Sequence, residues 1–162
     1  MQQEKIVFLD RDGVINFDHG DYTFRQDQFT LLPEVLKFAQ MAYSRHYRIV
    51  VITNQGGIAK GLYTWNDVHQ LHAHMKDLFI ENGTPLLDIF VSPDHDVVCN
   101  SISRKPEPLM IQRALYLYAA TPEKCFMVGD KESDVACAKW AGIRGVQIQR
   151  NSSLMQVADL LV

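Results

Sequence analysis

The stretch KIVFLDRDGVIN, residues 5–16, decides the fold of this chain of 162 residues. Residues 5–10 form a short apolar run of the kind found in strands buried on both faces of a parallel sheet. Asp10 and Asp12 come directly after it, and Gly13 permits a tight turn. A buried strand that ends in carboxylates indicates an α/β sheet with polar chemistry at the carboxyl ends of its strands.

The rest of the chain repeats this alternation. We expect further strands at residues 48–53, 86–92, 125–130 and 145–149. Helical patterns lie between them and begin at Pro33, Thr64, Pro108 and Asp134. The pattern predicts a doubly wound, Rossmann-like α/β fold: one parallel sheet of about five strands with right-handed crossovers and helices on both faces. The polar stretches 16–32 and 93–103 are expected to be loops at the strand ends.

The composition limits the classes of function. The chain has 16 Lys+Arg against 19 Asp+Glu, so it offers no broad cationic surface for nucleic acid. Its longest aliphatic runs have four residues, whereas a membrane-spanning helix needs about 20. We therefore expect one domain over residues 1–162, a monomer or homodimer, with neither nucleic acid nor membrane as a partner.

The chain start and the cysteines suggest a location. Residues 1–5 lead straight into the first strand without a basic or small-residue export signal. The cysteines are an odd, scattered set that suits a reducing compartment: Cys99, Cys125 and Cys137. We expect a cytoplasmic protein.

Carboxylates gather at two predicted strand ends. Asp10 and Asp12 crowd negative charge, which a hard divalent cation or a shared proton must relieve. Another strand ends at Asp130 and is followed by Asp134. Because parallel strands present their carboxyl ends at one edge, these groups can meet there. Oxygen ligands of this kind suit Mg²⁺.

Neutral donors and a fixed cation complete the pattern. Thr53, Asn54 and Gln55 end the second strand and can donate to phosphate oxygens. Pro106 disfavours the α region for Lys105, so that lysine is held extended ahead of a helix. Each motif alone is common in turns and on surfaces. Together, at successive strand ends, they indicate phosphoryl transfer.

These motifs resemble those of the haloacid dehalogenase (HAD) superfamily: Asp10-x-Asp12-Gly13, Thr53-Asn54, Lys105 and Gly129-Asp130-x-x-x-Asp134. The longer matches resemble its histidinol-phosphate and heptose-bisphosphate phosphatase subgroup: residues 10–16, 53–61, 104–106 and 129–131. The resemblance implies a small, capless HAD fold and a Mg²⁺-dependent phosphomonoesterase. A small phosphorylated metabolite, most closely a heptose bisphosphate, is the implied substrate.

The resemblance also implies roles for residues. Asp10 would be the nucleophile that forms an aspartyl-phosphate, and Asp12 the acid and base. Asp10, the backbone carbonyl of Asp12, and Asp130 would hold Mg²⁺, with Asp134 supporting from nearby. Lys105 would neutralise Asp10 and, with Thr53 and Asn54, grip the phosphoryl oxygens. The candidates for reading the sugar or a second anionic group are Asn16, Asp18, Gln55 and Arg104.

One stretch departs from the subgroup, whose members often bind zinc through three cysteines and a histidine before the Arg-Lys-Pro motif. Here the loop of residues 92–103 has serines in the expected cysteine positions, with His95 and Cys99. We expect no structural zinc. In the helix that begins at Thr64, we expect His69, His72 and His74 to face solvent or the helix rim.

Other activities remain open: a histidinol-phosphate phosphatase, a polynucleotide 3′-phosphatase, and a phosphoacceptor or binding module without turnover. The acidic net charge argues against the polynucleotide substrate. Asp12 argues against the phosphoacceptor module, because an acid and base two residues after the phosphorylated aspartate serves turnover.

Overall fold

The computed structural model describes residues 4–162 and contains a five-stranded sheet in the order β3-β2-β1-β4-β5. Its strands are β1 (Lys5–Leu9), β2 (Tyr47–Asn54), β3 (Asp88–Ser92), β4 (Phe126–Gly129) and β5 (Arg144–Gln147). All neighbouring strands are parallel, so their carboxyl ends share one edge. The predicted α/β fold is confirmed. Residues 1–3, part of the stretch considered for an export signal, lie outside the described residues.

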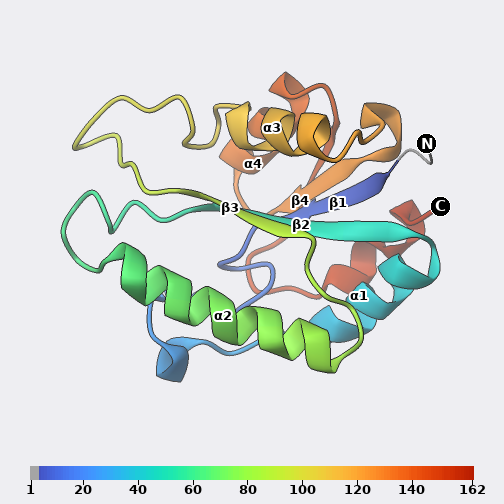
Figure 1. Cartoon of the computed structure of the whole chain (residues 1–162), viewed down its shortest axis with the longest axis horizontal. Helices are drawn as coiled ribbons and strands as arrows, with labels where there is room; N and C mark the ends of the chain where they lie inside the picture. Colours follow the sequence, from blue (N-terminus) through green and yellow to red (C-terminus); the bar gives the residue numbers. More distant parts are fainter. Residues whose placement is uncertain (1–3) are drawn as a thin grey trace.

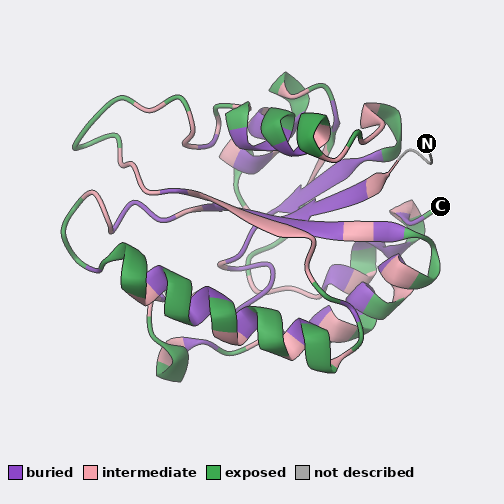
Figure 2. Ribbon diagram, viewed as in Figure 1, coloured by how far each residue is buried: buried purple, intermediate pink, exposed green. Residues whose placement is uncertain are grey.

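Helices cover both faces of the sheet (Figure 1). One layer contains α1 (Val35–Ser44), α2 (Trp65–Glu81) and the 3₁₀ helix Leu154–Leu160. The other contains α3 (Leu109–Leu117) and α4 (Glu132–Trp140). The sheet is therefore the middle layer of three, and Figure 2 shows its central strands almost wholly buried.

Side-chain alternation along β1 builds the two cores. Val7 and Leu9 pack in the core beneath α1 and α2, whereas Ile6 and Phe8 pack beneath α3 and α4. Because both faces of β1 are covered, its apolar residues follow one another without a polar interruption. Full burial of a side chain such as Phe8 stabilises the fold by about 1.5–3 kcal/mol.

The helix boundaries follow local chemistry. Thr64 caps α2, since Asp67 N donates to Thr64 Oγ1 at 3.2 Å and Thr64 N donates to Asp67 Oδ2 at 2.7 Å. Helix α4 begins at Glu132, two residues before the predicted start at Asp134. Sequence reasoning missed Leu154–Leu160, whose buried Leu154, Val157 and Ala158 cover the edge of the first core.

The two polar stretches lie at the carboxyl edge, as predicted. Residues 16–32 form a loop that contains a single 3₁₀ turn, Gln26–Gln28, and residues 93–103 contain no helix or strand. In Figure 1 loop 93–103 (yellow) projects from the end of the sheet opposite the chain termini, whereas segment 16–32 (blue) passes below α2 on its way to α1. Over residues 4–162, none of the helices is long and apolar enough to cross a membrane.

Candidate active site

A buried ion cluster lies where β1, β2 and β4 end. Lys105 Nζ lies 2.8 Å from Asp10 Oδ1 and 2.6 Å from Asp134 Oδ1, and it donates to the Ile52 carbonyl at 2.9 Å. All three charged residues are at most 5% exposed. Burial opposes the charge on Lys105, but the two carboxylates outweigh it and raise its pKa above the ordinary value. The lysine is therefore a permanent cation in the site.

A third carboxylate joins this cluster. Asp10, Asp130 and Asp134 each offer an oxygen, and these oxygens lie within 4.8 Å of one another. Burial, followed by the charge of Asp134, raises the pKa of Asp10 to about 7 despite the nearby lysine. Burial also raises the pKa of Asp130, whose buried Oδ1 has no hydrogen-bond partner among residues 4–162. A hard cation would satisfy that oxygen and favour the ionised forms of Asp10 and Asp130, so the donor set fits Mg²⁺.

Asp134 enters this cluster because Gly129 leaves room for it. A Cβ atom at position 129 would lie 2.2 Å from Asp134 Cβ, which is impossible without displacement. Asp134 Oδ2 accepts from Lys131 N at 3.0 Å, fixing the carboxylate at the start of α4. We predicted Asp134 to support the site from nearby; the structure places it in the same carboxylate group as Asp10 and Asp130.

Asp12 belongs to a second buried network. Its carboxylate lies 3.0 Å from Arg11 Nη2, and it accepts from Asn16 Nδ2 at 3.0 Å and Gln55 Nε2 at 3.1 Å. Burial disfavours the charge on Asp12, but Arg11 and the two amides outweigh it and lower the pKa. The free site thus presents Asp12 as a carboxylate. Arg11, fully buried, was missed by sequence reasoning because an arginine after a strand usually reaches solvent.

The two networks meet in one depression. A cavity of about 40 Å³ is lined by Asp10, Asp12, Asn54, Lys105, Lys131, Ser133 and Asp134. Five of these come from the predicted strand-end motifs. The nucleophile candidate, the acid–base candidate and the buried cation therefore face the same space, as phosphoryl transfer requires.

The other strand-end candidates lie one layer deeper. Asn16 is fully buried against Asp12, and Thr53, 1% exposed, accepts from Gln55 Nε2 at 2.8 Å. Tyr63 donates to Gln55 Oε1 at 2.7 Å, which fixes the orientation of that amide. Asn16 and Gln55 thus hold Asp12, and Thr53 holds Gln55, while Gln55 also lines the larger cavity described below. That these three residues touch substrate or phosphate stays a prediction.

Asn54 fixes the backbone of Lys105. Its Nδ2 donates to the Lys105 carbonyl at 3.1 Å, and its Oδ1 accepts from Lys105 N at 3.0 Å. This two-point contact joins the end of β2 to the segment before α3, residues that are 51 positions apart. Lys105 lies just ahead of α3, as predicted, in a turn in which Glu107 N donates to the Arg104 carbonyl at 2.9 Å.

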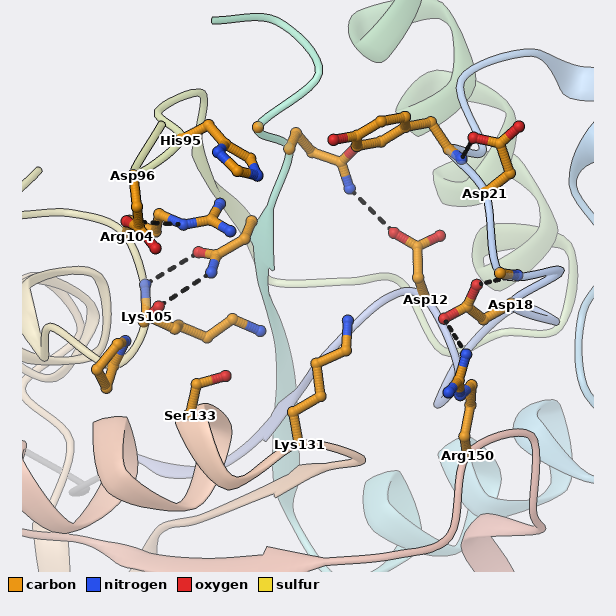
Figure 3. A pocket seen from close by; sticks show the side chains of 16 residues that line it. Asp12, Asp18, Asp21, His95, Asp96, Arg104, Lys105, Lys131, Ser133 and Arg150 are labelled. Atoms are coloured by element: carbon orange, nitrogen blue, oxygen red, sulfur yellow. Dashed lines mark hydrogen bonds and ion pairs between the residues drawn. The ribbon is translucent and has the colours of Figure 1, made fainter. Parts of the chain in front are cut away.

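A larger cavity of about 580 Å³ lies above the depression and is shared by loops 16–32 and 93–103 (Figure 3). On one side Arg104 pairs with Asp96 at 3.3 Å and donates to the Asp94 carbonyl at 2.9 Å. On the other side Arg150 lies 3.6 Å from Asp18. Arg104 and Asp18 line this cavity, as expected for substrate contacts. Arg150 was missed because it follows β5 without a recognisable motif.

The loop of residues 92–103 is organised by hydrogen bonds. Asp94 Oδ2 accepts from Ser101 Oγ at 2.6 Å, and Ser103 Oγ lies 3.0 Å from Ser92 Oγ. Cys99 is exposed, with its sulfur 3.8 Å from Asp94 Oδ1. Ser103 Oγ also donates to Asp94 Oδ2 at 3.4 Å, so two serines of this loop bond to one carboxylate. That the loop holds no zinc stays a prediction.

Comparisons with known proteins agree with this geometry. The sequence signature of a family described as HAD-hydrolase-like matches residues 102–157. The chain is 36% identical over 160 residues to a D-glycero-beta-D-manno-heptose-1,7-bisphosphate 7-phosphatase from Helicobacter pylori, covering 96% of this chain and 87% of that protein. It is 35% identical over 147 residues to a D-glycero-alpha-D-manno-heptose-1,7-bisphosphate 7-phosphatase from Burkholderia mallei, covering 87% of this chain and 77% of that protein.

A solved structure gives the same match in three dimensions. The D,D-heptose 1,7-bisphosphate phosphatase from B. bronchiseptica, complexed with magnesium and phosphate, superposes with a TM-score of 0.84 at 28% identity. The match covers 90% of this chain and 81% of that one. The likeness therefore extends over most of both chains.

Proposed function

Because the chain belongs to the HAD-type D-glycero-D-manno-heptose-1,7-bisphosphate 7-phosphatases, we propose that it removes the 7-phosphate from such a heptose bisphosphate. The observation that carries the proposal is the shared depression of Asp10, Asp12 and Lys105. It offers a nucleophile, a proton carrier and a cation at one point, which is the set that a phosphoric monoester hydrolase needs.

The larger cavity supports a bisphosphate in particular. Its walls carry Arg104 and Arg150, which do not line the buried depression, and Lys131, which lines both cavities. One phosphate in the depression would leave the sugar in the cavity and the second phosphate facing Arg104 or Arg150. The proposed partner is accordingly a small phosphorylated sugar of carbohydrate metabolism in the cytoplasm, with no nucleic acid or membrane involved.

The proposed reaction has two displacements. As the substrate enters as its monoanion, Asp12 takes the proton of the 7-phosphate. An Asp10 carboxylate oxygen then attacks phosphorus, the bond from phosphorus to the C7 oxygen breaks, and Asp12 gives that proton to the C7 oxygen. Asp12 then takes a proton from water as the water oxygen attacks phosphorus. The bond to Asp10 breaks, and inorganic phosphate leaves. Lys105 Nζ, 2.8 Å from Asp10 Oδ1, stabilises the charge that develops in both steps.

Asp10, Asp130 and the backbone carbonyl of Asp12 would hold Mg²⁺, and the position of Asp134 in the carboxylate group makes it a further support. When bound, the cation neutralises the charge that the carboxylates and the phosphoryl group bring together. The unpartnered Asp130 Oδ1 supports this assignment independently of any relative.

The test is phosphate release from heptose 1,7-bisphosphate with Mg²⁺, followed by ³¹P NMR to identify the phosphate that remains. Histidinol phosphate, the corresponding monophosphates and a 3′-phosphorylated oligonucleotide serve as competing substrates. We expect the highest kcat/KM with the bisphosphate and loss of the 7-phosphate. A higher kcat/KM for any competitor, or loss of the 1-phosphate, would contradict the proposal.

A further inference from the structure

His72 is a buried histidine that the proposed reaction does not use. It is 6% exposed, on the face of α2 that also buries Val68, Leu71 and Met75. The prediction that it faces solvent or the helix rim is therefore wrong. The cause is helical periodicity, which places position 72 beside 68, 71 and 75 on the apolar face.

Its partner is the guanidinium of Arg11. His72 Nε2 lies 3.1 Å from Arg11 Nη1, and a guanidinium can only donate. His72 Nε2 must therefore be unprotonated, which leaves the ring proton on Nδ1. Burial, followed by the charge of Arg11, lowers the pKa of His72 to about 3. The histidine is thus a neutral acceptor throughout the pH range of an ordinary assay.

Arg11 uses its other donors on Asp12 and the backbone. Arg11 Nη2 donates to both Asp12 oxygens at 3.0 Å and to the Thr23 carbonyl, and Nε lies 3.3 Å from Asp12 Oδ1. The donors of a guanidinium form a rigid planar fork, so fixing Nη1 fixes the plane from which the others point. Without His72, a buried N–H would lose its acceptor and the plane could tilt.

We infer that His72 is a positioning residue for Asp12, acting through Arg11. Leu71 and Met75 anchor α2 in the core on either side of His72, so the acceptor is part of a rigid element. Asp12 is 25% exposed by side chain and lines the depression, so its orientation faces the reacting group. The inference rests on the proposed function, in which Asp12 transfers the proton to and from the sugar oxygen and water.

Three variants separate positioning from packing. His72→Leu keeps the volume and removes the acceptor, whereas His72→Gln keeps an acceptor oxygen near the place of Nε2. His69→Leu, on the exposed face of the same helix, is the control. Thermal unfolding of each protein establishes that the variants are folded before kinetics are compared.

The kinetic readout is the dependence on the leaving group. A sugar phosphate needs a proton on its departing oxygen, but the phenolate of p-nitrophenyl phosphate departs without one. We expect His72→Leu to lower kcat/KM for the sugar phosphate on the order of tenfold and for p-nitrophenyl phosphate less than about threefold. His72→Gln should recover most of the sugar-phosphate loss. Equal losses on both substrates, or equal losses in both variants, would overturn the inference.

A spectroscopic readout does not depend on turnover. Side-chain ¹⁵N–¹H correlation of the wild-type protein should show His72 protonated at Nδ1 and bare at Nε2; the reverse tautomer would overturn the inference. If the wild type fails on heptose bisphosphate but hydrolyses another alkyl phosphate, the proposed substrate is wrong. The role of His72 can still be tested, by comparing the loss of kcat/KM in His72→Leu for that alkyl phosphate with the loss for p-nitrophenyl phosphate.

Discussion

The two ends of the sheet each carry a cavity lined by charged side chains, but they treat those charges differently. At the amino end, a cavity of about 680 Å³ is lined by the exposed His46, Lys124 and Arg144. At the carboxyl end, the smaller cavity of about 580 Å³ adjoins Asp10 and Lys105, which are almost fully buried. Cavity volume alone would therefore place the active site at the amino end, away from the buried charges.

The difference lies in free energy. Exposed charged side chains keep most of their hydration, so those that line the amino-end cavity need no compensating charge. Burying ions costs several kcal/mol each unless other charges and hydrogen bonds compensate. At the carboxyl end this compensation is incomplete, because the pKa of Asp10 is raised to about 7 and Asp130 Oδ1 lacks a partner. Incompletely compensated buried charge is what marks a reactive site.

Among variants that compare the two ends of the sheet, we expect the largest loss of kcat when the nucleophile is replaced. Asp10→Asn should reduce kcat by on the order of 10⁴-fold or more, because the amide cannot attack phosphorus. The matched variant at the other end, Lys124→Ala, should leave kcat within about twofold. Steady-state kinetics with saturating Mg²⁺ measure both. Comparable losses at the two ends would remove the distinction between them.

Lys105 should come next. Lys105→Ala should lower kcat on the order of 10²-fold or more, because the buried ammonium stabilises the charge on the transferring group. Denaturant unfolding in EDTA should also show a loss of about 3 kcal/mol, since Asp10 and Asp134 lose their shared cation. An unchanged kcat in the folded variant would exclude this role.

Metal binding sharpens the contrast further. Asp130→Asn should weaken Mg²⁺ binding on the order of 100-fold, because it replaces an anionic oxygen ligand, and EDTA should abolish turnover in the wild type. Isothermal titration calorimetry measures the Kd, with the exposed Asp27→Asn as control. Metal analysis should find no stoichiometric zinc. An unaltered Kd in Asp130→Asn would place the cation elsewhere.

The smallest effect concerns acid stability. His72 has a folded pKa of about 3 against an unfolded value of 6.5, so the unfolded chain binds more protons between these pH values. The free energy of unfolding contributed by His72 should therefore fall by about 2 kcal/mol between pH 7.5 and pH 5. His72→Gln should remove that part of the pH dependence in urea titrations, whereas the exposed His46→Gln should not. The same slope in both variants would contradict the assignment.

Sequence patterns predicted the central strands β1, β2 and β4 because these strands are buried and largely apolar on both faces. They also placed Asp10, Lys105 and Asp130 at one edge, because parallel strands have only one carboxyl edge. The sequence patterns could not predict how deeply each polar side chain is buried. Asn16 and Thr53 have the same hydrogen-bonding groups whether they line a cavity or lie beneath it, and only packing decides between these positions.

Long-range partners were equally out of reach. His72 meets Arg11 across 61 positions, and Asn54 meets the Lys105 backbone across 51. Neither spacing has a sequence signature, because the contact depends on how α2 and the segment before α3 dock on the sheet. Arg150 was missed for the same reason.

The central claim is that Asp10 carries the phosphoryl group during turnover. Wild-type enzyme mixed with heptose bisphosphate and Mg²⁺ can be quenched in acid, treated with borohydride to reduce any acyl phosphate, and digested for mass spectrometry. The account predicts reduction at Asp10 alone, dependent on substrate and absent in Asp10→Asn. Reduction at Asp12, or a rapid turnover that leaves every aspartate unreduced, would contradict it.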